Sequence, residues 1–263
     1  MCFNTQPERG YETMQFDFLT IFPDFFEPFR TTGVLGKAVD RGLIGIGVHD
    51  LRDWADNKWR QLDDDPYGGG PGMVIQAPPV LAAARELASR EPAPRTVLLS
   101  PRGRVFDQAM AEDFAQSKRL VVLCGRYEGF DERVSEILEP EEVSIGDYIL
   151  GGGEVAAMVV TEAVSRLVPG VVGDPDSVAE DSFIAGLLDH PSYTRPLDVE
   201  GREVPGVLRS GNHDKINRWR LERAVKETVT RRPDLIIEHW DRYPTDVRSL
   251  IRRYAPELDP ERA

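Results

Sequence analysis

The chain has 263 residues, 41% of them hydrophobic and 29% charged, and its formal net charge is −13. This composition is typical of a globular protein with room for one or two domains. The two cysteines, Cys2 and Cys124, are too few for a disulfide framework, which excludes a small disulfide-rich secreted protein and favours a reduced, cytoplasmic one. No apolar run is long enough to cross a bilayer, so we expect no membrane partner.

The charge is unevenly distributed along the chain. Residues 195–253 carry 14 Lys and Arg against 10 Asp and Glu, a net charge of +4, which leaves −17 for the remainder. A basic segment can bind a polyanion locally even in an acidic protein, because salt screens the distant charges. An ordinary charged helical surface explains the same pattern equally well.

The N-terminal part of the chain predicts an extension followed by alternating strands and helices. Residues 1–13 are polar and lack the apolar segment of a signal peptide, so we expect a disordered extension. Alternating polar and apolar residues predict a first strand at 15–21, and Pro23 marks the start of a helix. A second helix is expected at 32–41 and a second strand at 44–48.

Residues 63–73 contain three consecutive aspartates and then six glycines and prolines in seven positions around Tyr67. Glycine and proline disfavour both helix and central strand, so this segment is expected to form a loop. Loops of this kind often close over substrates. It is not a phosphate-binding P-loop, because no Lys-Ser or Lys-Thr follows the glycines. A plain flexible linker is the alternative, although Tyr67 and Met73 give the loop side chains that can dock.

Helices and continuously apolar strands alternate in the middle of the chain. The predicted helices span residues 79–90, 107–117 and 155–167, and the predicted strands span 96–100 and 120–124. The first of these strands is expected to end at Pro101. Apolar strands that alternate with helices predict a parallel sheet covered on both faces. The sequence therefore predicts an α/β domain over residues 14–172.

The pattern changes in the last third of the chain. Residues 173–190 are a linker by composition, and no strand-like run follows them. Helices are expected at 213–230, 234–240 and 245–254, and Ser210 or Asn212 can cap the first. We therefore predict a small, all-helical domain over residues 191–263.

The least generic segment, residues 124–158, combines glycines with acidic and aromatic residues. Its six glycines are Gly125, Gly129, Gly146, Gly151, Gly152 and Gly153. Glycine allows a close approach of backbone to a ligand, and both halves of the segment adjoin apolar runs. The ends of strands in an open α/β sheet are where ligands bind, so we expect a binding crevice here. Two ordinary surface loops are the alternative.

Seven segments resemble the family of bacterial tRNA (guanine-37-N1)-methyltransferases. They lie at residues 66–73, 99–101, 124–129, 144–148, 180–183, 193–196 and 208–213. Each is a weak signal alone, but their order and spacing over residues 16–232 make the resemblance very specific. It implies a SPOUT-class methyltransferase, whose parallel-sheet domain has a C-terminal trefoil knot that binds S-adenosylmethionine. It also implies a homodimer that acts on tRNA with a guanosine 3′ of the anticodon.

The resemblance assigns two catalytic residues. Asp181, in Glu-Asp-Ser-Phe, matches the family's general base, and Arg166 matches the residue that supports negative charge on guanine O6. Taken alone, Asp181 reads as a helix-capping residue in a polar linker. Arg166 taken alone complements a helix dipole.

The resemblance also assigns binding residues. Those implied for the methyl donor, mostly through backbone groups, are Leu99, Ser100, Gly125, Glu128, Ile145, Gly146, Asp147, Tyr148, Ile149, Leu150, Gly152 and Gly153. Those implied for RNA are Tyr67, Gly70, Pro71, Gly72, Lys215, Arg218 and Arg220. The family is known to require magnesium, but the sequence shows no cluster of metal ligands. Two alternatives stay open, a methyltransferase of the same fold acting on another RNA and a non-catalytic RNA-binding protein.

Overall fold

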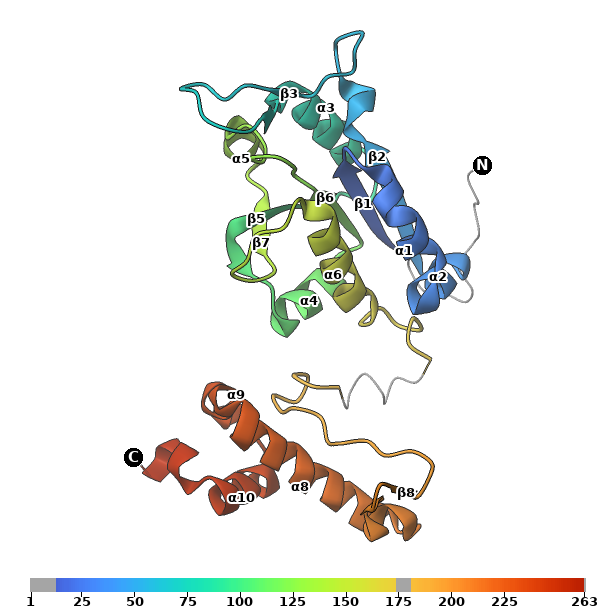
Figure 1. Ribbon diagram of the computed structural model, residues 1–263, viewed down its shortest axis with the longest axis vertical. Coiled ribbons are helices and arrows are strands. Elements are labelled where there is room, and N and C mark those ends of the chain that lie inside the picture. The colour runs from blue at the N-terminus through green and yellow to red at the C-terminus, as the bar shows by residue number, and fades with distance from the viewer. Residues whose placement is uncertain (1–12, 174–180, 263) are drawn as a thin grey trace. The chain divides into compact units, whose positions relative to one another are not determined.

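The computed structural model describes residues 13–173 and 181–262 (Figure 1). The chain divides into two compact units, Met1–Pro175 and Asp176–Ala263, which we call the sheet unit and the helical unit and describe one at a time. The predicted N-terminal extension lies almost entirely outside the described residues, as does the centre of the predicted linker.

The sheet unit is built on a five-stranded parallel sheet in the order β2-β1-β6-β5-β7. Its strands are β1 (Met14–Thr20), β2 (Ile44–Asp50), β5 (Arg95–Val105), β6 (Arg119–Leu123) and β7 (Glu141–Ser144). Every residue of β6 is buried, as a strand in the middle of a covered sheet requires. The prediction of a parallel α/β sheet is confirmed.

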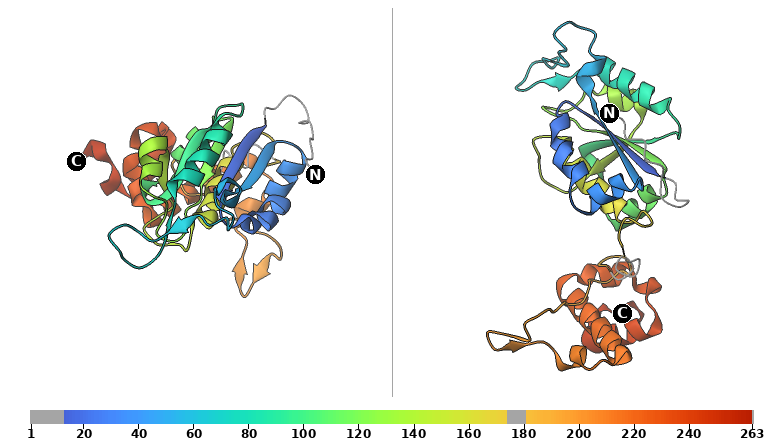
Figure 2. Two further views of the ribbon diagram at one scale, coloured as in Figure 1. Left: turned by 90° about the horizontal axis from the view of Figure 1, so that it is seen from above. Right: turned by 90° about the vertical axis from the view of Figure 1, so that its right-hand side faces the viewer.

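Helices pack on both faces of this sheet (Figure 2). They are α1 (Glu27–Thr31), α2 (Gly33–Asp40), α3 (Ala77–Ala88), α4 (Gln108–Ala115), α5 (Arg133–Leu138) and α6 (Gly153–Ser165), with the 3-10 turns η1 (Pro23–Phe26) and η2 (Leu51–Trp54). One core joins the sheet to α2, α4 and α6, and a second joins it to α3 and α5. Phe18 and Leu19, consecutive in β1, belong to opposite cores, because side chains alternate along a strand.

Strand β5 continues through the segment where we expected it to end. It pairs with β7 on both sides of a register shift between Leu99 and Arg104. Irregularities of this kind tolerate proline, which cannot donate to the ladder. A Cβ at Gly103 would lie 2.3 Å from the backbone nitrogen of Val143, so only glycine allows this approach. The predicted end of the strand at Pro101 is therefore wrong.

The glycine-rich segment forms a loop, as predicted, but two short strands pair with each other at its two ends. Strands β3 (Asp63–Asp64) and β4 (Val74–Ile75) form a two-residue antiparallel ladder. The residues between them adopt turns or irregular conformations, and the Tyr67 side chain is fully exposed.

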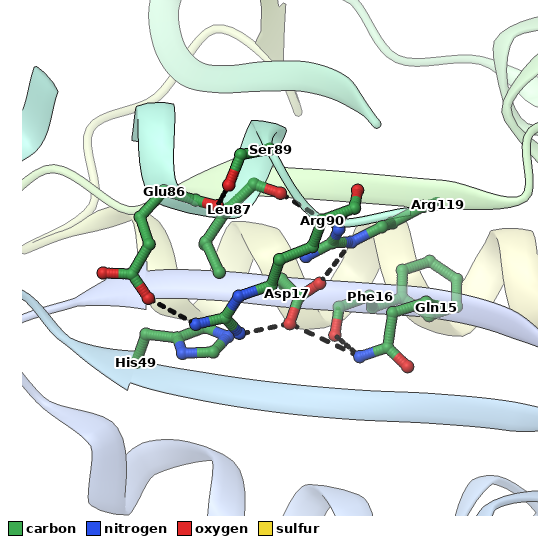
Figure 3. A network of polar contacts seen from close by, with 9 residues as sticks. All are labelled: Gln15, Phe16, Asp17, His49, Glu86, Leu87, Ser89, Arg90 and Arg119. Atoms are coloured by element: carbon green, nitrogen blue, oxygen red, sulfur yellow. Dashed lines mark hydrogen bonds and ion pairs between the residues drawn. The ribbon is translucent and has the colours of Figure 1, made fainter. Parts of the chain in front are cut away.

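A buried polar network ties three strands to the end of α3 (Figure 3). The Arg119 guanidinium donates to the Asp17 carboxylate over 2.8 Å, and the His49 ring lies 2.7 Å from the other carboxylate oxygen. Arg119 also donates to the carbonyl of Leu87, in the last turn of helix α3, at 3.0 Å, and to that of Arg90, just beyond the helix, at 2.9 Å. Burial opposes ionisation of Asp17, but the hydrogen bonds from His49 and Arg119 outweigh it and lower the pKa of this carboxyl.

In the part of the helical unit that the structure describes, three α-helices pack around a separate core. They are α8 (His213–Arg231), α9 (Pro233–Glu238) and α10 (Thr245–Tyr254), with the 3-10 turns η3 (Gly206–Arg209), η4 (Trp240–Arg242), η5 (Pro256–Leu258) and η6 (Pro260–Arg262). Asn212 caps α8, because its side-chain oxygen accepts from the Lys215 amide at 3.0 Å, which confirms one of the two predicted caps. The core contains Val225, Ile236 and Ile251.

Two features of the helical unit differ from the prediction. Strands β8 (Asp198–Val199) and β9 (Arg202–Glu203) form a short exposed hairpin, so the unit is not all-helical. Residues 181–190 were expected as the end of the linker, yet Leu187 is 7% exposed and belongs to this unit's core. A segment that its composition assigns to a polar linker therefore contributes to the folded helical unit.

Candidate functional site

A pocket of about 290 Å³ is formed by the middle of β5, the residues that follow β6 and β7, and the start of α6. Eleven of the twelve residues predicted to bind the methyl donor line it: Leu99, Ser100, Gly125, Glu128, Ile145, Gly146, Tyr148, Ile149, Leu150, Gly152 and Gly153. The twelfth, Asp147, is not among the lining residues. The fold therefore brings together residues that are up to 54 positions apart in the sequence.

Glycines bring two pocket walls into backbone contact. The Gly153 amide donates to the Gly125 carbonyl with an N···O distance of 2.9 Å. A Cβ at Gly153 would lie 2.9 Å from the Cα of Cys124, closer than side chains tolerate. Helix α6 can begin against the end of β6 only because this residue has no side chain.

A tight turn after β7 forms a third wall. Gly146 has a φ of +139°, a backbone conformation that favours glycine. Its amide donates to the Ser144 hydroxyl over 3.2 Å, and its carbonyl accepts from the Tyr148 amide over 2.9 Å. The Tyr148 hydroxyl donates to the Ile145 carbonyl over 3.1 Å, which fixes the half-exposed tyrosine ring beside the pocket.

A buried ion pair supports the pocket wall, and the sequence analysis missed it. Glu154 is fully buried and accepts from Arg126 over 2.8 Å and from the Thr20 hydroxyl over 2.7 Å. Arg126 also donates to the Gly151 carbonyl over 3.0 Å. Its guanidinium lies 4.8 Å from the ring centre of Phe22 and 5.0 Å from that of Phe25. A glutamate on an otherwise apolar helix face is the signal that could have revealed this pair.

The glycine-rich loop ends against the pocket. The Glu128 amide donates to the Met73 carbonyl over 3.0 Å, and a Cβ at Gly72 would lie 2.4 Å from the Glu128 carboxylate. Gly70 and Gly72 both have positive φ, at +134° and +89°. Four residues of this loop are predicted to bind RNA: Tyr67, Gly70, Pro71 and Gly72. The last of them, Gly72, lies directly against the pocket residue Glu128.

Cys124, which precedes Gly125 at the pocket, is poorly suited to act as a nucleophile. Burial raises the pKa of the Cys124 thiol well above its ordinary value, and the charge of Glu154 adds to this effect, so the thiolate needed of a nucleophile is disfavoured. Within residues 13–173 and 181–262, no three His, Cys, Asp or Glu side chains are grouped so as to hold a metal ion. Nor do these residues include a helix with the length and apolar character needed to cross a membrane.

The two predicted catalytic residues belong to different units. Arg166 is half-buried and directly follows α6, where its amide donates to the Glu162 carbonyl over 3.3 Å. It is not among the residues that line the pocket. Asp181 is half-buried in the helical unit, and its carbonyl accepts from the Ile184 amide over 3.4 Å.

The three predicted RNA-binding residues of the helical unit lie on α8. Lys215 and Arg218 are exposed, and Arg220 is half-buried. Arg218 makes one long ion pair with Glu222, at 3.7 Å, which holds its guanidinium only weakly. The side chains of Lys215 and Arg218 are therefore exposed to solvent on one helix.

Comparisons with known proteins agree with this picture. The family model for tRNA (guanine-1)-methyltransferase TrmD matches residues 14–238. A protein of Rhodopirellula baltica named tRNA (guanine-N(1)-)-methyltransferase is 49% identical over 241 residues, covering 90% of this chain and all of the relative. Proteins of the same name from Geobacter metallireducens and Dictyoglomus turgidum are 48% and 49% identical over 223 residues, covering 85% of this chain and 91% and 90% of the relatives. The chain therefore belongs to the tRNA (guanine-1)-methyltransferase TrmD family.

Proposed function

We propose that this protein transfers a methyl group from S-adenosylmethionine to N1 of guanosine 37 in tRNA, next to the anticodon. Family membership supports methylation of a guanine in tRNA. The observation that carries the finer proposal is the glycine-walled pocket, which gathers eleven of the residues expected around the donor.

The pocket suits such a donor in its chemistry. Its volume, about 290 Å³, is close to the lower limit for small-molecule sites, about 300 Å³. Backbone groups of glycines form much of the wall, so an adenine ring can be recognised by main-chain hydrogen bonds without side chains holding it off. Glu128 supplies one carboxylate for the positive end of the donor. The bound donor would supply an electrophilic methyl group on a sulfonium.

The chain's own residues would handle the proton and the developing charge. N1 of neutral guanine carries a proton, which Asp181 would remove as general base. As the proton leaves, negative charge builds on O6, and the Arg166 guanidinium would stabilise it. A general base contributes about 10²–10⁴-fold in rate. A cation aimed in advance at a developing oxyanion contributes a comparable share.

The helical unit would hold the tRNA. Lys215, Arg218 and Arg220 on α8 can contact phosphates, which position a nucleic acid without reading its sequence. The target guanosine must leave its stack to enter a pocket, as RNA recognition commonly requires. The loop that ends at Gly72, against Glu128, is suited to cover the base once it has entered.

The proposal includes a homodimer. Large apolar side chains of the sheet unit are exposed on η1, α2, α6 and the loop before α6: Phe22, Phe25, Val34, Ile149, Val155 and Val159. Val155 and Val159 lie four residues apart and therefore share one face of α6. Exposed apolar faces of this kind commonly bind a partner. Light scattering should give twice the chain mass, and a monomer at micromolar concentration would contradict the dimer.

The family resemblance implies two further features, a trefoil knot and a need for magnesium, and both are proposals here. The trefoil knot rests on family membership, and a chain trace without a threaded loop at residues 124–153 would contradict it. The side chains described do not form a magnesium site, so we assign the ion no step. Equal rates of transfer with magnesium and with a chelator would argue against a requirement.

One experiment tests the proposed reaction. Radiolabelled S-adenosylmethionine is offered to two tRNA transcripts that differ only in guanosine or adenosine at position 37. We expect label in the guanosine transcript alone, and N1-methylguanosine after nuclease digestion. Equal label in both transcripts would contradict the proposal, because methyl transfer would then not depend on guanosine 37. Label in neither would also contradict it, and would favour an enzyme for another RNA or a non-catalytic RNA-binding protein.

A further inference from the structure

The segment that carries Asp181 folds into a compact turn within the helical unit. The Phe183 amide donates to the Leu187 carbonyl over 2.8 Å, and the Gly186 amide donates back to the Phe183 carbonyl over 3.1 Å. The Asp189 amide donates to the Ser182 hydroxyl over 2.9 Å. Phe183 and Gly186 both have positive φ, at +76° and +73°. A turn with this much unusual backbone geometry needs support from outside itself.

Tyr243 supplies that support from beyond residues 14–238, which match the family model. Its ring is 4% exposed, and its hydroxyl oxygen lies 2.7 Å from the Gly186 carbonyl oxygen and 3.1 Å from that of Leu235. A hydroxyl has one hydrogen to donate, and the shorter distance favours Gly186. Burial raises the pKa of Tyr243 to about 12, so the hydroxyl keeps its proton at neutral pH.

His239 fixes the same glycine from a second direction. A Cβ at Gly186 would lie 2.9 Å from a ring carbon of His239, so the imidazole is packed directly on the glycine. One residue further on, Leu187 enters the core, and the Leu188 amide donates to the Thr228 hydroxyl over 2.9 Å. The end of the turn is therefore anchored on α8 and on the segment that follows α9.

We propose that Tyr243 is a positioning residue for the methyl transfer. Its hydroxyl holds the Gly186 carbonyl, the Gly186 amide holds Phe183, and this chain of hydrogen bonds sets the backbone on which Asp181 stands. The inference rests on the proposed function, because Asp181 needs accurate placement only if it removes the guanine proton. Small displacements of a catalytic group can lower a rate by about 10²-fold.

The competing explanation is that Tyr243 only fills the core of the helical unit. Tyr243→Phe separates the two, because it removes the hydroxyl and keeps the ring. The matched control is Ile251→Val, which weakens the same core at a fully buried residue whose side chain makes no hydrogen bond. Gly186→Ala is a second variant that disturbs the turn from the side of His239 and leaves the tyrosine hydroxyl in place.

We expect Tyr243→Phe to lower kcat about tenfold at saturating donor and tRNA, with KM for both substrates and the donor Kd unchanged. The pH profile should keep its inflection at a lower plateau. Hydrogen exchange at the amides of Phe183 and Gly186 should be faster. Gly186→Ala should behave in the same way, and Ile251→Val should keep both kcat and the slow exchange.

Two results would overturn the inference. One is an equal loss of kcat in Tyr243→Phe and Ile251→Val when their melting temperatures match, and the other is unchanged exchange at Phe183 and Gly186 in Tyr243→Phe. If the unaltered protein transfers no methyl group, the proposed function fails and the catalytic part of this inference fails with it. Hydrogen exchange needs no activity, so in that case it still reports whether Tyr243 holds the turn.

Discussion

The sheet unit and the helical unit offer two different kinds of surface to a ligand. Glycines, among them Gly146, Gly152 and Gly153, expose backbone at several points of the pocket of the sheet unit. The helical unit presents side chains on α8, where Lys215 and Arg218 are exposed. Backbone walls suit a small ligand of fixed shape, and long cationic side chains suit a flexible polyanion.

The two surfaces are therefore disturbed by different kinds of substitution. A backbone wall has no side chain to remove, so it is disturbed by atoms added to a glycine. A side-chain surface is disturbed by deletion, and each deletion removes one contact. Because each unit has its own core, we expect donor binding to depend on the sheet unit alone, and the phosphate contacts of α8 and the proton transfer to depend on the helical unit.

The largest effect should come from Asp181→Asn. The amide cannot accept the guanine proton, so we expect kcat to fall about 10²–10⁴-fold. Donor affinity should be unchanged, because the pocket is lined by residues of the sheet unit. Rapid-quench methyl transfer measures the rate, and calorimetry measures donor binding.

The control for this substitution is Asp189→Asn, at an exposed aspartate in the same segment, which should keep the rate. Loss of donor binding in Asp181→Asn would show a structural role for Asp181 and would contradict the separation between the two units.

The second effect, on stability alone, should come from Arg119→Met. This change leaves the Asp17 carboxylate buried, 5% exposed, without its guanidinium partner. Removing one partner of a buried pair costs about 3–5 kcal/mol of unfolding free energy. Arg119 begins β6, and the pocket residue Gly125 lies beyond the opposite end of that strand, so the folded fraction should bind the donor normally. Urea unfolding and calorimetry measure the two quantities.

An exposed pair provides the comparison for Arg119. Arg30→Met breaks an ion pair with Glu27 in which both side chains are more than 40% exposed. Such pairs contribute about 0–1 kcal/mol. If Arg119→Met cost no more than Arg30→Met, the network of Figure 3 would not be a stabilising element of the sheet unit.

The third effect should come from Gly153→Ala. The added Cβ would meet the Cα of Cys124 at 2.9 Å, so backbone must shift where α6 begins. Overpacking of this kind costs about 1–3 kcal/mol of stability. We expect donor affinity to fall about tenfold or more, which corresponds to a loss of about 1.4 kcal/mol or more in binding.

Gly151→Ala is the matched control in the same loop. A Cβ there meets only the Arg126 guanidinium, at 3.6 Å, an ordinary contact. This variant should bind the donor as the unaltered protein does. Equal losses at the two glycines would mean that loop flexibility, and not the close approach at Gly153, controls the pocket.

The same difference between the units explains what the sequence could predict. Strands β1 and β6 are apolar along most of their length, so their burial is visible in the residues themselves. Strand β7 has four residues, two of them glutamates, and α5 has six, so neither gives a periodic signal long enough to recognise. Eleven of the twelve residues predicted to surround a methyl donor line one pocket, because the resemblance that assigned them rests on short motifs in a fixed order.

Pairings between distant side chains could not be predicted. Arg126 and Glu154 lie 28 positions apart, and Asp17 and Arg119 lie 102 apart, so only the fold shows that they meet. The start of the helical unit was harder still to predict from the sequence. Residues 181–190 look like linker because most of them are polar or small, and Leu187 anchors them through contacts that only the tertiary structure contains.

The smallest effect should come from Arg218→Ala on α8. If this side chain contacts a phosphate, its removal should lower the slope of log affinity for tRNA against log salt concentration by about 1. Its ion pair with Glu222 is long, at 3.7 Å, and the Arg218 side chain is 79% exposed, so the change should cost little stability. Lys37→Ala, at an exposed cation on α2 of the sheet unit, is the control and should leave the slope unchanged.

Donor affinity and kcat at saturating tRNA should also be unchanged in Arg218→Ala, because a phosphate contact positions the RNA and takes no part in the proton transfer. A weaker affinity for the donor in this variant would show that α8 and the pocket are energetically coupled, and would contradict the independence that we expect of the two surfaces.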